Sequence, residues 1–323
     1  MKASPRKEGL GVVIPVHFPS DVEPELIGRV LEETLHGQEA FCPHSQCLMV
    51  VDQGTRADAV LTQAPASSPL SRVGRDRLER NRGKAGSVCR GIRRLLRNND
   101  LRWIVSRDCD GDHLLDDLPR FLRLAGELES HHPLFAIFGA RSSYAKSMGW
   151  VRQEWEKLTN RLFLDCTAYL AATRGQVLDR RYWNRWPLDL QCGYRLYSRQ
   201  AALLAVQGLE ELPDDPEVYT FANEMLPFLD LSLAGGSVGQ VPCTSRTGQL
   251  FSNYASFDMA ARYGRFLAYV AERHEIPADS LHKLVDGRLF ASHLFWSDQR
   301  QQVLRFRSLL CPQAPDPIPP RHV

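Results

Sequence analysis

Short apolar runs rich in β-branched residues recur in the first part of the chain, at Leu10–Val16, Cys47–Val51 and Trp103–Ser106. Uninterrupted runs of this kind are typical of strands that are buried on both faces of a parallel sheet. Segments with helical spacing of apolar residues accompany them, most clearly at residues 24–35 and 84–96. Strands that alternate with helices form βαβ units. The sequence therefore predicts an α/β fold with a mostly parallel central sheet flanked by helices.

The alternation loosens after about residue 140, and the last third of the chain has a helical pattern. Strands are predicted at residues 190–197 and 237–241, and helices at residues 255–275 and 280–309. The end of the chain repeats proline, which favours an extended and flexible segment. We therefore expect an α/β domain, a helical extension and a flexible tail, at residues 1–254, 255–310 and 311–323 respectively.

The composition is that of an ordinary globular protein, with 43% hydrophobic and 24% charged residues and a net charge of +2. No apolar run is long enough for a membrane span, and the N-terminus lacks the apolar core of a secretory signal. The eight cysteines form no C-x-x-C pair, which is typical of reduced thiols rather than of a zinc knuckle. These features predict a cytoplasmic protein without an integral membrane span.

Basic residues are concentrated between residues 72 and 97, where Asp76 and Glu79 are the acidic residues that oppose them. Such a stretch can meet an anion, but it is more often the solvated face of a helix. No nucleic-acid-binding motif accompanies it, so no nucleic-acid partner is predicted.

The sharpest motif is RDCDGDH at residues 107–113, directly after a predicted strand. Ligands of open α/β sheets bind beyond the carboxyl ends of the strands. Carboxylates at Asp108, Asp110 and Asp112 alternate along this segment and can converge on one cation. Their oxygen atoms are suited to Mg²⁺ or Mn²⁺, which is the cofactor that we expect.

Other classes of acidic motif compete for this segment. An EF-hand loop requires Gly at its sixth position and Glu at its twelfth, where this chain has His113 and Pro119, so that class is excluded. A Mg²⁺-dependent phosphohydrolase of the haloacid dehalogenase type has Thr or Val where Asp112 stands, and it is kept as an alternative. An acidic turn that caps the next helix through its dipole is the structural alternative.

Further motifs occur in a fixed order around this one. They read VVIPV, VVDQGTRAD, NRGKAGSV, DCDGDHLLDDLPRFL, a strand ending in GAR, DLQCGYRLYSR, and ANEML leading to GQVPC. In this order, over residues 10–250, the chain resembles family 2 glycosyltransferases, in particular the dolichol-phosphate-mannose-synthase-like branch. The resemblance implies a GT-A fold, the Rossmann-like fold of nucleotide-diphospho-sugar transferases. It also implies metal-dependent transfer of a hexose, with inversion, from a donor such as GDP-mannose or UDP-glucose.

The resemblance implies roles for individual residues. Contacts to the nucleotide sugar fall on Pro15, Asp52, Lys84, Asp108, Cys109, Asp110 and Arg141. The metal ligands implied are Asp108, Asp110 and Asp112. Asp189 and Glu224 are the candidate bases that deprotonate an acceptor hydroxyl, and Arg195 and Arg246 are candidates to hold the acceptor or a phosphate.

Two departures from the family pattern concern the donor. After the first strand the family carries an Asn-Glu pair, whereas this chain has His17 and Phe18, and Gln53 replaces a second acid. The donor and the acceptor, whether small molecule, glycan or lipid phosphate, therefore stay open, as does homo-oligomer formation. A catalytically silent sugar-nucleotide-binding protein remains a further alternative.

Overall fold

The structure is a computed structural model that describes residues 9–52, 55–141, 149–183, 188–244 and 258–313. Its centre is a seven-stranded sheet with the order β3-β2-β1-β4-β6-β5-β7. The strands are β1 (Leu10–Val16), β2 (Cys47–Val51), β3 (Gly74–Arg77), β4 (Trp103–Ser106), β5 (Phe135–Arg141), β6 (Arg195–Ser198) and β7 (Ser237–Cys243). Neighbouring strands are parallel except that β6 is antiparallel to both β4 and β5. The predicted mostly parallel sheet is confirmed.

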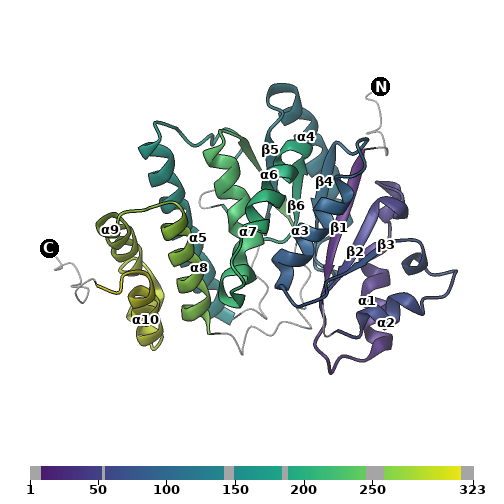
Figure 1. Ribbon diagram of the computed structural model, residues 1–323, viewed down its shortest axis with the longest axis horizontal. Helices are drawn as coiled ribbons and strands as arrows, with labels where there is room; N and C mark the ends of the chain where they lie inside the picture. The colour runs from purple at the N-terminus through teal and green to yellow at the C-terminus, as the bar shows by residue number, and fades with distance from the viewer. Residues whose placement is uncertain (1–8, 53–54, 142–148, 184–187, 245–257, 314–323) are drawn as a thin grey trace.

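Helices cover both faces of this sheet (Figure 1). They are α1 (Pro24–Leu35), α2 (Ala57–Thr62), α3 (Gly83–Leu95), α4 (Leu118–His131), α5 (Gly149–Thr173), α6 (Arg199–Glu210), α7 (Pro216–Leu233), α8 (Met259–Arg273), α9 (Ala278–Leu289) and α10 (Arg300–Leu310). Val12 and Ile14 pack into a core with α1, α2 and α4, and Val13 packs into a second core with α3 and α5–α7. Because alternate side chains of β1 enter different cores, the whole run must be apolar.

The C-terminal helices α8, α9 and α10 share the second core with α5 and α7. They lie at the end of the molecule opposite β3 (Figure 1). The single helix expected at residues 280–309 is divided into α9 and α10, because Ser292 caps a short helical turn at His293–Trp296 that separates them. The start of the helix predicted from residue 255 and most of the predicted tail lie outside the described residues.

Two local expectations differ from the structure. The basic stretch contains the edge strand β3 as well as α3, and its arginines pair with acids: Arg90 and Arg94 with Asp76, and Arg93 with Glu210. The strand expected at residues 190–197 begins at Arg195, because residues 190–194 form a loop. Within the described residues, no helix is sufficiently long and apolar to cross a membrane.

Candidate functional site

A cavity of about 630 Å³ opens where β1, β2, β4 and β5 end, against the N-terminal parts of α3 and α7. This volume is in the range of ordinary small-ligand pockets. Its walls are formed by Pro15, Val16, His17, Phe18, Asp52, Asn81, Gly83, Lys84, Ser87, Asp108, Cys109, Asp110, Asp112, His113, Arg141, Arg152, Gln191, Cys192, Gly193, Pro216, Tyr219, Glu224 and Arg262. All but three of the predicted site residues are among them.

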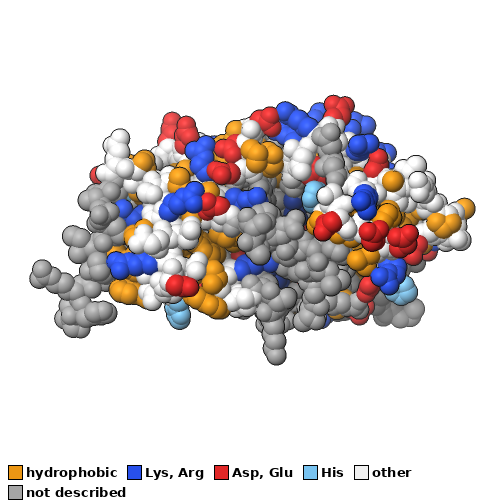
Figure 2. Space-filling model, turned by 90° about the horizontal axis from the view of Figure 1, so that it is seen from below, with side chains coloured by type: hydrophobic (Ala, Val, Ile, Leu, Met, Phe, Trp, Pro, Cys, Tyr) orange, Lys and Arg blue, Asp and Glu red, His pale blue; other side chains and the backbone are white. Residues whose placement is uncertain are grey.

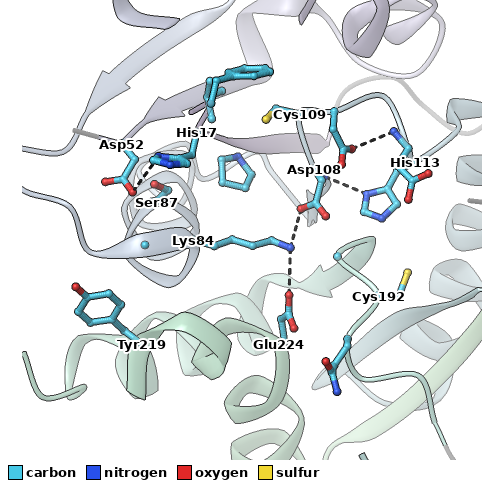
Figure 3. Close-up of a pocket in the computed structure, with 18 of the residues that line it drawn as sticks. His17, Asp52, Lys84, Ser87, Asp108, Cys109, His113, Cys192, Tyr219 and Glu224 are labelled. Atoms are coloured by element: carbon cyan, nitrogen blue, oxygen red, sulfur yellow. Dashed lines mark hydrogen bonds and ion pairs between the residues drawn. The ribbon is translucent and has the colours of Figure 1, made fainter. Parts of the chain in front are cut away.

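The acidic segment after β4 is shaped by its own hydrogen bonds (Figure 3). The backbone N–H of Asp108 donates to Nδ1 of His113 over 3.0 Å, and the N–H of Asp112 donates to Oδ1 of Asp110 over 3.1 Å. Arg107 lies buried beneath the segment and donates to the carbonyl oxygen of His113. The turn is therefore formed before any ligand arrives.

Lys84 from α3 reaches across the cavity to two carboxylates that come from different elements (Figure 3). Its Nζ lies 2.8 Å from Oδ1 of Asp108 and 3.3 Å from Oε1 of Glu224 on α7. Burial alone would raise the pKa of Asp108, but the positive charges of Lys84, His113 and Arg195 together outweigh it and lower the pKa to about 2. Burial prevails at Glu224 and raises its pKa. Glu224 is thus the carboxylate of this cluster that takes up a proton more readily.

Gly193 is a site residue that the motif analysis did not single out, although it lies within the quoted segment DLQCGYRLYSR. A Cβ at this position would lie only 2.4 Å from Oδ2 of Asp108. The backbone of the 190–194 loop is therefore in direct contact with the Asp108 carboxylate, and any larger residue at position 193 would displace that carboxylate.

The other end of the cavity is suited to a flat ring. Pro15 and Phe18 come from the end of β1, and Tyr219 projects from α7 (Figure 3). Asp52, which is buried at the end of β2, lies 3.8 Å from Nδ1 of His17. The predicted donor contacts at Pro15, Asp52 and Lys84 are thus brought together in one cavity.

Arg141 enters the cavity from the end of β5 and is held by a buried ion cluster. Its guanidinium donates two hydrogen bonds of 2.7 Å to Asp189, and it also donates to Glu156 over 2.8 Å. Both carboxylate oxygens of Asp189 are engaged in this way, and Asp189 is not among the residues that line the cavity. Of the two candidate bases, Glu224 faces the cavity, whereas Asp189 lies behind Arg141.

Arg195 also lies outside the cavity wall. It is buried, its Nε donates to the carbonyl oxygen of Cys192 over 3.1 Å, and its guanidinium lies 5.1 Å from the ring centre of Phe138. In this position it supports the 190–194 loop from beneath. Arg246 lies outside the described residues.

The chemistry of the acidic segment fits a hard divalent cation. Oxygen atoms of Asp108, Asp110 and Asp112 are suited to Mg²⁺ or Mn²⁺. Burial and the neighbouring Asp108 raise the pKa of Asp110, and a bound cation would favour its ionised form. Among the described residues, however, no group of three or more His, Cys, Asp or Glu side chains is close enough to form a metal site by itself.

The face that Figure 2 shows carries basic and acidic side chains side by side. Over its described part, Lys and Arg are interspersed with Asp and Glu rather than gathered in a stripe of one sign. A basic stripe is the usual electrostatic footprint of a nucleic-acid interface. The described part of this face lacks that footprint.

No protein-family model matches the chain, and no curated protein is similar to it at a significant level. Among solved structures, it is similar to mannosyl-3-phosphoglycerate synthase from Rubrobacter xylanophilus, with 14% identity, a TM-score of 0.49, and coverage of 83% of this chain and 75% of the other. It is also similar to CMP:2-keto-3-deoxy-manno-octonic acid synthetase complexed with CTP, with 15% identity, a TM-score of 0.39, and coverage of 73% and 90%. A third is the 4-diphosphocytidyl-2C-methyl-D-erythritol synthase from Anaerococcus prevotii, with 12% identity, a TM-score of 0.37, and coverage of 78% and 100%. At such low values, these likenesses say nothing about the substrate of this chain.

Proposed function

We propose that this chain is a glycosyltransferase that moves a hexose from a nucleoside-diphosphate sugar, of the GDP-mannose or UDP-glucose type, to an acceptor. One observation supports the proposal above all: Asp52 after β2, Lys84 at the start of α3 and the acidic segment after β4 face one cavity. In that arrangement Asp52 can accept a hydrogen bond from the nucleoside, the Lys84 ammonium can contact the phosphates, and the acidic segment offers carboxylates to a metal. All of them lie at the carboxyl ends of the strands, where ligands of open α/β sheets bind.

The nucleotide-sugar donor would lie across the carboxyl ends of the strands. The nucleoside would occupy the end formed by Pro15, Asp52 and Tyr219, and the diphosphate would lie beside Lys84. The N–H groups at the start of α3 favour an anion there, and Gly83 has the positive φ of 59° that this turn requires. A Mg²⁺ or Mn²⁺ ion that takes ligands from Asp108, Asp110 or Asp112 together with oxygen atoms of the diphosphate would neutralise the charge that accumulates on the leaving diphosphate, because the three carboxylates alone do not form a site.

Glu224 is the residue that we assign as base. In a single displacement, the acceptor oxygen bonds to the anomeric carbon, the bond from that carbon to the diphosphate breaks, and the hydroxyl proton passes to Glu224. Burial raises the pKa of Glu224, which makes it a better proton acceptor than an exposed glutamate. Lys84 contacts both Glu224 and Asp108 and so fixes the positions of the two carboxylates relative to each other. A single displacement inverts the configuration at the anomeric carbon.

The acceptor would lie at the opposite end of the cavity. Arg141, Arg152 and Arg262 line that end, and β5, which carries Arg141, is separated from β2 by three other strands. The bidentate contact with Asp189 fixes the guanidinium plane of Arg141. Fixed guanidinium groups suit a phosphate or carboxylate on the acceptor, or a phosphate of the donor.

Thermal-shift measurements with GDP, UDP and their sugars, with and without Mn²⁺, test the proposal. A transferase should be stabilised by a nucleotide sugar in a metal-dependent manner. Asp110→Ala should abolish this stabilisation, whereas Asp116→Ala, which changes an exposed acid outside the cavity, should retain it.

Product analysis separates the alternatives. Hydrolysis of the nucleotide sugar, or transfer to an added acceptor, supports the transferase. Stabilisation without turnover of any nucleotide sugar indicates a silent binding protein, and release of phosphate from simple esters indicates the phosphohydrolase. Either of the last two results refutes the proposal.

A further inference from the structure

Two thiols lie in contact at the loop that touches Asp108. Cys192, in the 190–194 loop, and Cys243, the last residue of β7, have their sulfur atoms 3.5 Å apart. A Cβ on Gly139 of β5 would lie 2.7 Å from one sulfur and 3.0 Å from the other. The missing side chain of this strand residue thus leaves a space that both sulfur atoms share. No other pair of cysteine sulfur atoms in the described chain is within hydrogen-bond distance.

The two thiols differ in access and in reactivity. Both residues are buried, with 1% of Cys192 and 2% of Cys243 exposed, but Cys192 is part of the cavity wall and Cys243 is not. Hydrogen bonds from Cys243 and His113 lower the pKa of Cys192, although burial opposes them. A thiolate that can be reached from a cavity is the form that attacks an oxidant. Cys192 is therefore the attacking sulfur and Cys243 the resolving one.

We propose that Cys192 and Cys243 are a redox modification site, at which a peroxide closes a disulfide and thereby moves the 190–194 loop relative to Asp108. The Cys192 thiolate attacks one peroxide oxygen, the O–O bond breaks, and a sulfenic acid and hydroxide form. The Cys243 thiol then attacks the sulfenic sulfur, and water leaves as the disulfide forms. Each sulfur gives up one electron, and the peroxide takes up both.

The disulfide would change the site because its geometry differs from that of the thiol pair. The sulfur atoms must approach from 3.5 Å to about 2.05 Å, which draws the two chain segments together. Gly193, next to Cys192, has its backbone against the Asp108 carboxylate, and Arg195 donates to the carbonyl oxygen of Cys192. Movement of Cys192 is therefore transmitted to the acidic segment. The loss of donor binding that follows rests on the proposed function.

The test compares the full-length protein after treatment with hydrogen peroxide and with dithiothreitol. Peptide mapping should join Cys192 to Cys243, with a mass lower by about 2 Da because two thiol hydrogens are lost. Hydrogen exchange of the peptides that cover residues 108–113 and 190–194 should rise on oxidation and return on reduction. Cys243→Ser should prevent the cross-link and the change in exchange, and Cys89→Ser, which alters another buried cysteine, should prevent neither.

Binding of GDP with MnCl₂ is measured on the same samples. A cross-link that forms while hydrogen exchange stays unchanged overturns the proposed movement, and the absence of the cross-link overturns the modification site. If the reduced protein binds no nucleotide, the proposed function fails, whereas the thiol pair is still judged by mass and exchange.

Discussion

Replacement of Lys84 by methionine tests the charge balance on which the site depends. The change keeps the length of the side chain but removes the ammonium that lies 2.8 Å from Asp108 and 3.3 Å from Glu224. Removal of one partner from a buried ion pair costs about 3–5 kcal/mol, because the remaining charge is left buried without compensation. We expect a loss of stability of about 3 kcal/mol, at the lower end of this range. The Asp108 side chain is 28% exposed, so water still solvates its charge, and Glu224 can take up a proton and become neutral.

The expected change in Tm follows from this loss of stability and from the length of the chain. Unfolding entropy is about 2.1 cal/mol/K per residue, so for 323 residues a loss of about 3 kcal/mol lowers Tm by about 4 °C. Differential scanning calorimetry measures both the Tm and the unfolding enthalpy. Lys157→Met is the matched control, because it removes an ammonium that is 38% exposed, against 25% for Lys84, from a 2.7 Å pair with Glu154 on the same helix, and it should cost less than about 1 kcal/mol.

Addition of Mn²⁺ gives the same variant a second readout. With the ammonium removed, a cation at Asp108 no longer competes with Lys84, so Mn²⁺ alone should raise the Tm of Lys84→Met more than that of the unmodified protein. A variant as stable as the unmodified protein would refute the assignment of Lys84 as the internal counter-charge. An equal response of both proteins to Mn²⁺ would refute the location of the metal beside it.

Three further predictions concern other parts of the structure. Asp189→Asn should lower the free energy of unfolding in urea by about 3 kcal/mol, because this carboxylate neutralises a buried arginine; a fall in turnover with unchanged stability would instead indicate a base. Gly193→Ala should weaken binding of GDP with Mn²⁺ by roughly tenfold or more, since the overlap with the Asp108 carboxylate costs about 1–3 kcal/mol, whereas Gly126→Ala, in open space on α4, should leave binding unchanged. Hydrogen bonds from Arg181 lower the pKa of Asp179 from 3.8 to about 2, so the stability that they supply is complete above 3.8 and is lost as the pH falls through 2. In Asp179→Asn, the free energy of unfolding measured in urea should fall less between about pH 4 and pH 2 than in the unmodified protein. An equal fall in both proteins would contradict the contribution assigned to Asp179.

The buried strands could be predicted because a strand buried on both faces requires an uninterrupted run of apolar residues. The predicted bounds of β1, β2 and β4 agree with the structure, since both faces of each strand enter a core and require apolar residues. β3 has no apolar run. Its residues GRDR alternate between half-buried and exposed positions at the edge of the sheet, and its pairing with β2 supplies the hydrogen bonds that hold it.

The site was predictable where its residues directly follow a strand. Asp52, Asp108 and Arg141 follow β2, β4 and β5 closely or end them, and the structure brings all three to the cavity. Asp189 and Arg195 could not be assigned in this way. Asp189 precedes the 190–194 loop and pairs with Arg141, and Arg195 begins β6 and donates to backbone carbonyl groups of that loop; the sequence does not record either direction.

The sequence by itself determined the α/β class, the buried strands and the cluster of carboxylates, because periodicity and residue chemistry are local properties of the chain. The tertiary structure decided which charges meet. Lys84 and Glu224 are separated by 140 positions, and Cys192 and Cys243 by 51, yet each pair is in contact. Such contacts depend on how helices and strands pack across the sheet, and the balance of charge in the cavity depends on them in turn.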